Sequence, residues 1–231
     1  MIKLLLYLIP IGLIYLPDLW IKYNFKKNNK YFEDMPFTGK ELGKKILEEN
    51  NLKDIPINSL KDLPIEGCNY DPEKKEINIS ESIYDRKSIT SIAVIVHEIG
   101  HAIQDKEKAK LLNLRISLIK KTQSLRKAGS ILLIIGIPSL FALIKSPLLI
   151  ILFTLVIILS FSTNVLINLI TLPNEIDASF KKALPILKRY APKDNLKQCR
   201  SVLVAAAFTY LAASIRSILS LRLIFLALFR R

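Results

Sequence analysis

The two histidines of this chain lie four residues apart, in the sequence His97-Glu98-Ile99-Gly100-His101. Residues four apart project from one face of a helix, so both imidazoles can bind one metal ion. The glutamate between them lies where it can take a proton from a water molecule at that metal. The H-E-x-x-H pattern therefore predicts zinc as cofactor, with His97 and His101 as ligands and Glu98 as general base.

A histidine in an apolar helix is more often a satisfied core residue than a ligand. This chain, however, has only two histidines, and their placement with Glu98 in the required slot has a chance probability of about one in a thousand. Burying Glu98 without a partner would also cost several kcal/mol, roughly. We therefore favour a zinc site over a packed core.

The third ligand of this site must be a residue other than histidine. A catalytic zinc keeps three protein ligands and one open position, and no third histidine exists. Glu175 and Asp177 follow a long apolar stretch that starts after the metal helix. If that stretch crosses a membrane twice, it returns the chain to the side of His97 and His101. Both carboxylates are therefore candidates.

The segments around the motif read as a small folded region. Thr38-Gly39-Lys40-Glu41 is a capping box that predicts a helix of about 12 residues, with Leu42, Ile46 and Leu47 buried. Residues 65–80 read as a β-hairpin with its turn at residues 71–74. Residues 88–104 predict a buried helix that is apolar nearly all round, and residues 106–127 a helix that leads to the membrane.

The composition is that of a membrane protein, because 51% of the residues are hydrophobic. Residues 128–144 and 146–174 carry no charge and are separated only by Lys145, so they predict a transmembrane hairpin with a tight turn. Residues 1–21 read as an uncleaved anchor rather than a signal peptide. Residues 201–231 are interrupted by Arg216 and Arg222 and either span the membrane or lie in its interface.

The charge pattern predicts the orientation of these segments. The net charge is +14, and basic residues cluster in the segment after the anchor and between residues 173 and 200. The positive-inside rule places both regions in the cytoplasm and Lys145 outside. This topology explains the charge better than nucleic-acid binding, for which no aromatic-rich basic motif is present.

Cys68 and Cys199 are far apart, which indicates neither a disulfide framework nor a cysteine zinc site.

Nearly the whole chain resembles the membrane-embedded neutral zinc metallopeptidases of bacteria, a family with the H-E-x-x-H motif. The resemblance includes the apolar N-terminus, the helix opening at Thr38-Gly39 and the metal helix from His97 to Gln104. Further shared segments are Tyr70-Asp71-Pro72 with Lys74-Lys75, Arg86-Lys87-Ser88, Leu172-Pro173 with Glu175, Ala178 and Ser179, Ala205-Ala206-Ala207, and Thr209-Tyr210.

More distantly, residues 175–179 are similar to the Glu-x-x-Ala-Asp segment of membrane proteases related to the CAAX prenyl protease. In those relatives the glutamate is the third zinc ligand, which implies that role for Glu175. This sequence departs at Ser179, where they have an aspartate that orients a zinc-bound histidine. If a helix begins near Pro173, Glu175 shares its face with the small residues Ala178 and Ser179, which favours Glu175 over Asp177.

The resulting expectation is a mainly α-helical integral membrane protein with three to four transmembrane helices and a zincin-like catalytic region that contains a small β-hairpin. Its expected parts are an anchor (1–21), a cytoplasmic region with the motif (22–127), a transmembrane hairpin (128–172), a cytoplasmic segment with the third ligand (173–200) and a C-terminal membrane-embedded or interfacial helix (201–231).

The expected function is zinc-dependent hydrolysis of peptide bonds in a peptide or protein substrate at the cytoplasmic face of the cell membrane. Two alternatives remain open: a zinc-binding membrane scaffold without hydrolytic activity, and hydrolysis of a non-peptide amide or a lipid-linked bond. Tyr84, Asn174 and Tyr210 are candidates to stabilise the oxyanion, with no preference among them. Residues 76–80 form either a substrate-binding strand or a packed edge strand.

Overall fold

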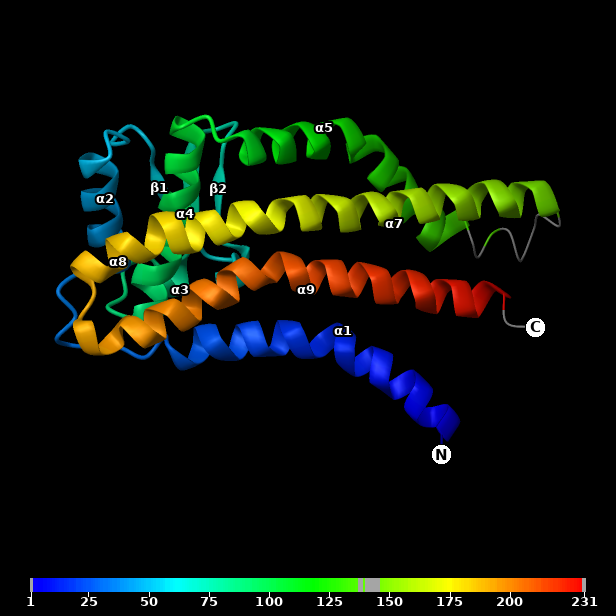
Figure 1. Cartoon of the computed structure of the whole chain (residues 1–231), viewed down its shortest axis with the longest axis horizontal. Coiled ribbons are helices and arrows are strands. Elements are labelled where there is room, and N and C mark those ends of the chain that lie inside the picture. Colours follow the sequence, from blue (N-terminus) through cyan, green and yellow to red (C-terminus); the bar gives the residue numbers. More distant parts are fainter. Residues whose placement is uncertain (1, 137–138, 140–145, 230–231) are drawn as a thin grey trace. The chain divides into compact units, whose positions relative to one another are not determined.

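The computed structural model describes the backbone of residues 2–136, 139 and 146–229, most of which is helical (Figure 1). A three-stranded sheet is the β-structure among these residues. The expectation of a mainly helical protein with a small β-element is therefore confirmed. The longer helices are α1 (Ile2–Lys27), α2 (Gly39–Glu49), α4 (Ile89–Lys106), α5 (Lys110–Ile131), α7 (Pro147–Ile176), α8 (Leu184–Tyr190) and α9 (Leu196–Phe229).

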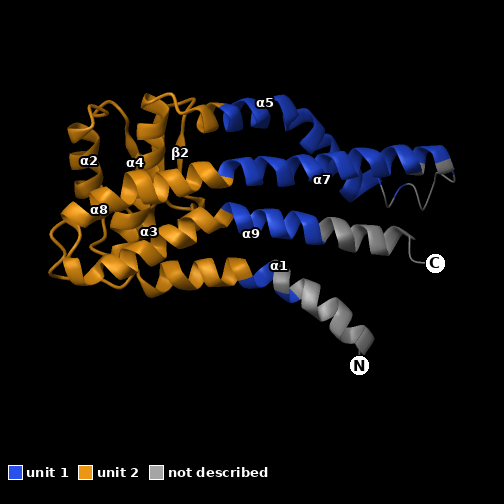
Figure 2. Cartoon of the chain, in the orientation of Figure 1, with its two compact units in different colours: residues 1–16, 114–171, 210–231 blue, residues 17–113, 172–209 orange. Residues whose placement is uncertain are grey.

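The chain divides into two compact units (Figure 2). Unit 1 comprises residues 1–16, 114–171 and 210–231, and unit 2 comprises residues 17–113 and 172–209. Unit 2 contains the sheet, the H-E-x-x-H motif and both candidate third ligands. Two separate stretches of sequence therefore build the part of the molecule in which the predicted chemistry lies.

The sheet of unit 2 has the order β1-β3-β2, from β1 (Ile57–Leu60), β2 (Asn69–Asp71) and β3 (Glu76–Ser80). The predicted hairpin is the antiparallel pair of β2 and β3. β1 pairs parallel to the other side of β3 and was not predicted. Because β3 has neighbours on both sides, the expectation that residues 76–80 form an edge strand or receive a substrate strand is wrong.

Helix α2 begins as its capping box predicts. The backbone N–H of Thr38 donates to the Glu41 carboxylate at 2.8 Å, and the backbone N–H of Glu41 donates to the Thr38 hydroxyl at 3.3 Å. Leu42, Ile46 and Leu47 are buried as expected. Their face packs against α4, so α2 fixes one side of the helix that carries the motif.

Helix α4 is the centre of unit 2. Its N-cap is Ser88, whose hydroxyl accepts a hydrogen bond from the backbone N–H of Ser91 at 3.1 Å. Every residue from Ile89 to Gln104 is buried, which confirms the prediction of a helix that is apolar nearly all round. α4 packs against α2, β2, α8 and the segment Asp177–Ala183, so the histidines on it are surrounded by packed elements of unit 2.

The segment after the apolar stretch differs from the prediction. We expected a helix to begin at Pro173, but α7 runs through Pro173 to Ile176 and continues as a π-helical segment, Asp177–Ala183, and then as α8. A proline removes one backbone hydrogen bond, and the 30-residue helix tolerates that loss.

Two helical stretches among the described residues are long and apolar enough to cross a membrane, Ile151–Tyr190 and Lys193–Leu219. We expected three to four. The first arm of the predicted hairpin, 128–144, and its turn at Lys145 include residues 137–138 and 140–145, which lie outside the described residues. Residues 201–229 of the predicted C-terminal segment belong to α9, a continuous helix of 34 residues, and residues 230–231 lie outside the described residues.

Candidate metal centre

His97 and His101 lie on one face of α4, as their spacing predicts. Their ring centroids are 4.8 Å apart and the ring planes are 82° apart. Both side chains are buried, with relative exposures of 4% and 6%. The buried helix α4 thus holds two imidazoles next to one another.

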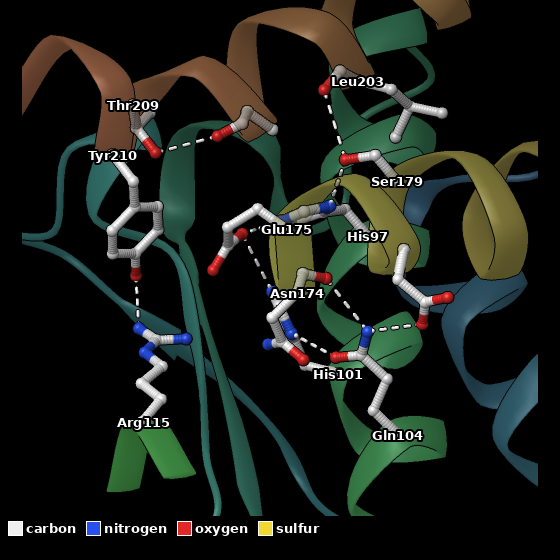
Figure 3. A network of polar contacts seen from close by, with 12 residues as sticks. His97, His101, Gln104, Arg115, Asn174, Glu175, Ser179, Leu203, Thr209 and Tyr210 are labelled. Atoms are coloured by element: carbon white, nitrogen blue, oxygen red, sulfur yellow. Dashed lines mark hydrogen bonds and ion pairs between the residues drawn. The ribbon is translucent and has the colours of Figure 1, made fainter. Parts of the chain in front are cut away.

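Glu175 meets these two imidazoles from the end of α7 (Figure 3). Its Oε2 atom is 3.1 Å from Nε2 of His101 and 3.3 Å from Nε2 of His97. One donor atom from each of the three residues lies within 4.8 Å of the other two, and Glu175 is 1% exposed. The three buried side chains converge from segments more than 70 residues apart.

The donor set of this cluster fits a zinc ion. Imidazole nitrogen and carboxylate oxygen are zinc ligands, and two histidines with one glutamate form a three-ligand set typical of catalytic sites. Both histidines present the same ring nitrogen, Nε2, to the carboxylate. The cluster could therefore hold zinc with three protein ligands.

Small residues allow α4 and the π-helical segment to approach closely. A Cβ atom on Gly100 would lie 2.8 Å from the carbonyl oxygen of Ala178. Ala178 and Ser179 are both fully buried. The sequence-based expectation that these small residues permit close packing on the metal helix is confirmed.

Ser179 contacts the first histidine at its outer nitrogen. Its Oγ lies 3.0 Å from Nδ1 of His97 and also donates to the carbonyl oxygen of Leu203 at 3.2 Å (Figure 3). The more distant relatives considered above have an aspartate at the position of Ser179. Here the hydroxyl provides the contact to the ring in place of a carboxylate.

Gln104 contacts the second histidine in the same way, and sequence reasoning gave it no role. Its Oε1 lies 2.9 Å from Nδ1 of His101. Its Nε2 donates to the carbonyl oxygen of Asn174 at 3.0 Å and to Oδ2 of Asp177 at 2.7 Å. The spacing of three residues after His101 was an available signal, because such residues are neighbours on a helix surface.

Asp177 therefore lies beside the cluster without being one of its three members. Besides accepting from Gln104, it forms an ion pair with Lys181 at 3.5 Å, and its side chain is 28% exposed. The sequence argument had placed Asp177 on the same side as Lys181. Glu175 is the carboxylate that the structure brings between the histidines.

Glu98 is buried on α4 at 5% exposure, and its charge affects the pKa of the Cys68 thiol. Burial is the main cause that raises the pKa of the Cys68 thiol to about 12, and the negative charge of Glu98 adds to the increase. The sulfur of Cys68 also accepts from the backbone N–H of Ser80 at 3.2 Å. Cys68 is thus a protonated neighbour of the predicted general base.

The three oxyanion candidates differ in their contacts. The Tyr84 hydroxyl donates to the carbonyl oxygen of Ile57 at 3.3 Å, and the Tyr210 hydroxyl accepts from Arg115. Asn174, directly before Glu175, is 1% exposed, and its Nδ2 is a buried donor that meets no acceptor among the described residues. Of the three candidates, Asn174 is the one that lies next to the cluster and has a buried donor with no acceptor among the described residues.

Comparisons with known proteins agree with this chemistry. The sequence profile of the family described as "Putative neutral zinc metallopeptidase" matches residues 3–229. The "Putative membrane protease YugP" of Bacillus subtilis (strain 168) is 32% identical over 222 residues, which cover 96% of this chain and 94% of that protein. No solved structure matches the chain. The cofactor expected from the motif, zinc, is the metal of this family. The chain belongs to the neutral zinc metallopeptidase family.

Proposed function

We propose that this protein is a membrane-bound zinc peptidase in which His97, His101 and Glu175 hold the metal. The convergence of these three buried side chains is the observation that carries the proposal. Zinc, when bound, supplies the Lewis acidity that lowers the pKa of water toward about 7. The name of the relative, a membrane protease, supports a peptide or protein as the substrate.

Glu98 is the proposed general base. Its carboxylate takes a proton from the attacking water as the water oxygen bonds to the carbonyl carbon of the peptide. It then delivers that proton to the amine nitrogen as the C–N bond breaks. Glu98 is buried on α4, so the same carboxylate can serve both transfers with little competition from bulk water.

Asn174 is the proposed donor to the oxygen that becomes negative during this attack. A buried donor without a partner requires an explanation, and a substrate oxygen would provide the missing acceptor. Loss of one such donor reduces kcat by about 10²- to 10³-fold in enzymes that use it. The variant Asn174→Ala should therefore lose kcat while it keeps its zinc, and an unchanged kcat would remove this role.

Unit 1, except for residues 114–127, is the proposed membrane part. It contains none of the 20 Asp and Glu residues of the chain. Large apolar side chains on α7 within this unit are exposed, including Leu148 at 74%, Ile151 at 66% and Leu155 at 51%. Apolar surface of this extent is typical of a lipid-facing helix. We place residues 22–127 and 173–200 at the cytoplasmic face, because their basic residues favour that side.

The test is a matched set of variants of the purified, detergent-solubilised chain. Glu98→Gln should keep zinc but reduce cleavage of an unfolded protein by roughly 10²- to 10⁴-fold, because an amide cannot accept the proton. Glu81→Gln, at an exposed glutamate, should retain both. A chelator should abolish the activity. Zinc binding without cleavage in the unmodified chain would favour a scaffold instead.

A further inference from the structure

Gln104 joins the metal cluster to a carboxylate outside it. Its side-chain amide has one acceptor atom, Oε1, and one donor atom, Nε2. Oε1 faces Nδ1 of His101 at 2.9 Å, while Nε2 faces Asn174 and Asp177. Gln104 is 1% exposed, so bulk water does not compete for these contacts. The amide therefore has one partner on its oxygen side and two on its nitrogen side.

The two partners on the nitrogen side fix the orientation of the amide. The backbone carbonyl of Asn174 can only accept a hydrogen bond, and the same is true of an ionised Asp177 carboxylate. A flipped amide would place its oxygen 3.0 Å or less from both acceptors. That arrangement is repulsive, so Oε1 must point toward His101.

The orientation of Gln104 in turn fixes the proton on His101. Oε1 can only accept, so Nδ1 of His101 must carry the hydrogen. When the neutral ring binds a metal ion together with Glu175, its lone pair is then on Nε2, the atom that faces Glu175 at 3.1 Å. This is the form of histidine that binds a metal through Nε2.

We propose that Gln104 is a positioning residue that holds His101 in its metal-binding form, and that Asp177 acts through Gln104 rather than as a ligand. The inference rests on the proposed zinc site. Partners that orient a metal-bound histidine commonly change metal affinity by about 10- to 100-fold when they are removed. Gln104 would provide that contribution for His101.

Zinc affinity, measured by competition with a chelator on the detergent-purified full chain, tests the proposal. Gln104→Met should weaken binding by about 10- to 100-fold. Gln123→Met, at an exposed glutamine of α5, should not change it. An unchanged affinity in Gln104→Met would overturn the proposal, whereas a wild-type chain that binds no zinc would overturn the proposed function itself.

Two variants at Asp177 show whether this residue holds the Gln104 side chain or binds the metal ion itself. In Asp177→Asn the side-chain oxygen can still accept from Nε2 of Gln104, so zinc affinity should stay close to that of the wild type. In Asp177→Ala it should fall, but less than in Gln104→Met, because the carbonyl of Asn174 still holds the amide. Equal large losses in both variants would identify Asp177 as a ligand. Asp177 is partly exposed, so these variants should fold.

Nitrogen-15 NMR of the zinc-loaded protein gives a readout that does not depend on activity. The chain has only two histidines, so selective ¹⁵N-histidine labelling reports this site alone when the purification tag contains none. Both Nδ1–H groups should be protected from exchange in the wild type. In Gln104→Met the Nδ1–H of His101 should exchange faster, while the Nδ1–H of His97 stays protected. In Ser179→Ala the Nδ1–H of His97 should exchange faster, while that of His101 stays protected. Protection of His101 that survives Gln104→Met would refute the proposal.

Discussion

Gly100 lies directly against the backbone of Ala178. A Cβ atom at position 100 would come within 2.8 Å of the Ala178 carbonyl oxygen and within 3.4 Å of its Cα. The obstacle is backbone rather than a side chain that could rotate away. The glycine inside the H-E-x-x-H motif thus sets how closely the π-helical segment, and Glu175 before it, can approach the histidines.

Gly100→Ala should therefore weaken zinc binding and lower the melting temperature. Overpacking in a well-packed core costs about 1–3 kcal/mol, which outweighs the gain in helix propensity of up to about 1 kcal/mol. Gly12→Ala is the matched control, because among the described residues its Cβ would meet the side chain of Leu16 alone, at 3.9 Å. Thermal unfolding and a zinc titration measure both effects, and a Gly100→Ala chain as stable as the control would contradict this packing argument.

Removal of the metal ligands should give a graded series. His97→Ala and His101→Ala should abolish tight zinc binding, because two ligands are too few to retain the ion. Glu175→Ala should lose most of the affinity, and Asp177→Ala much less. Elemental analysis of the purified variants measures this series directly. Full zinc occupancy in either histidine variant would mean that the metal is held elsewhere.

Cys68 should be unreactive toward maleimide in the folded protein at pH 8. Burial raises the pKa of its thiol to about 12, so roughly one molecule in 10⁴ carries the reactive thiolate at that pH. Labelling should become faster as the pH rises from 7 to 9, and it should be fast at pH 8 after denaturation. Mass spectrometry distinguishes Cys68 from Cys199, and rapid native labelling of Cys68 at pH 8 would show that the thiol is not held in its protonated form.

Cysteine accessibility in intact cells should reveal the topology. In a background without native cysteines, a cysteine at position 145 should react with an impermeant reagent from outside. Cysteines at positions 50 and 193 should react only after the membrane is opened. They lie in residues 22–127 and 173–200, whose basic residues favour the cytoplasmic side. The reverse pattern would invert the orientation without changing the metal site.

Local signals in the sequence predicted much of the fold. The capping box at Thr38 and the continuous apolar run around His97 depend on residues within a few positions of one another, so their structures follow from local preferences. The pairing of Glu175 with the histidines was also anticipated. It required the assumption that an apolar segment returns to the side from which it left, which left both Glu175 and Asp177 as candidates. The resemblance to the more distant proteases and the helix-face argument then favoured Glu175.

Long-range contacts explain what the sequence did not reveal. Strand β1 is short and half-exposed, and it is stabilised by parallel pairing with residues 20 positions later. Gln104 obtains its role from Asn174 and Asp177, which are 70 and 73 positions away. The passage of α7 through Pro173 likewise opposes the local preference of proline, because packing in the folded chain determines where the helix ends.

The order in which the ribosome makes the chain has a consequence for this site. His101 and Glu175 are separated by 74 positions, and residues 114–171 between them belong to unit 1. At about 5–20 residues per second, several seconds pass between the synthesis of the two residues. A nascent chain in that interval has both histidines and no Glu175. The metal site is therefore completed only after the intervening segment has been made. A nascent chain that has not reached Glu175 lacks one of the three proposed zinc ligands.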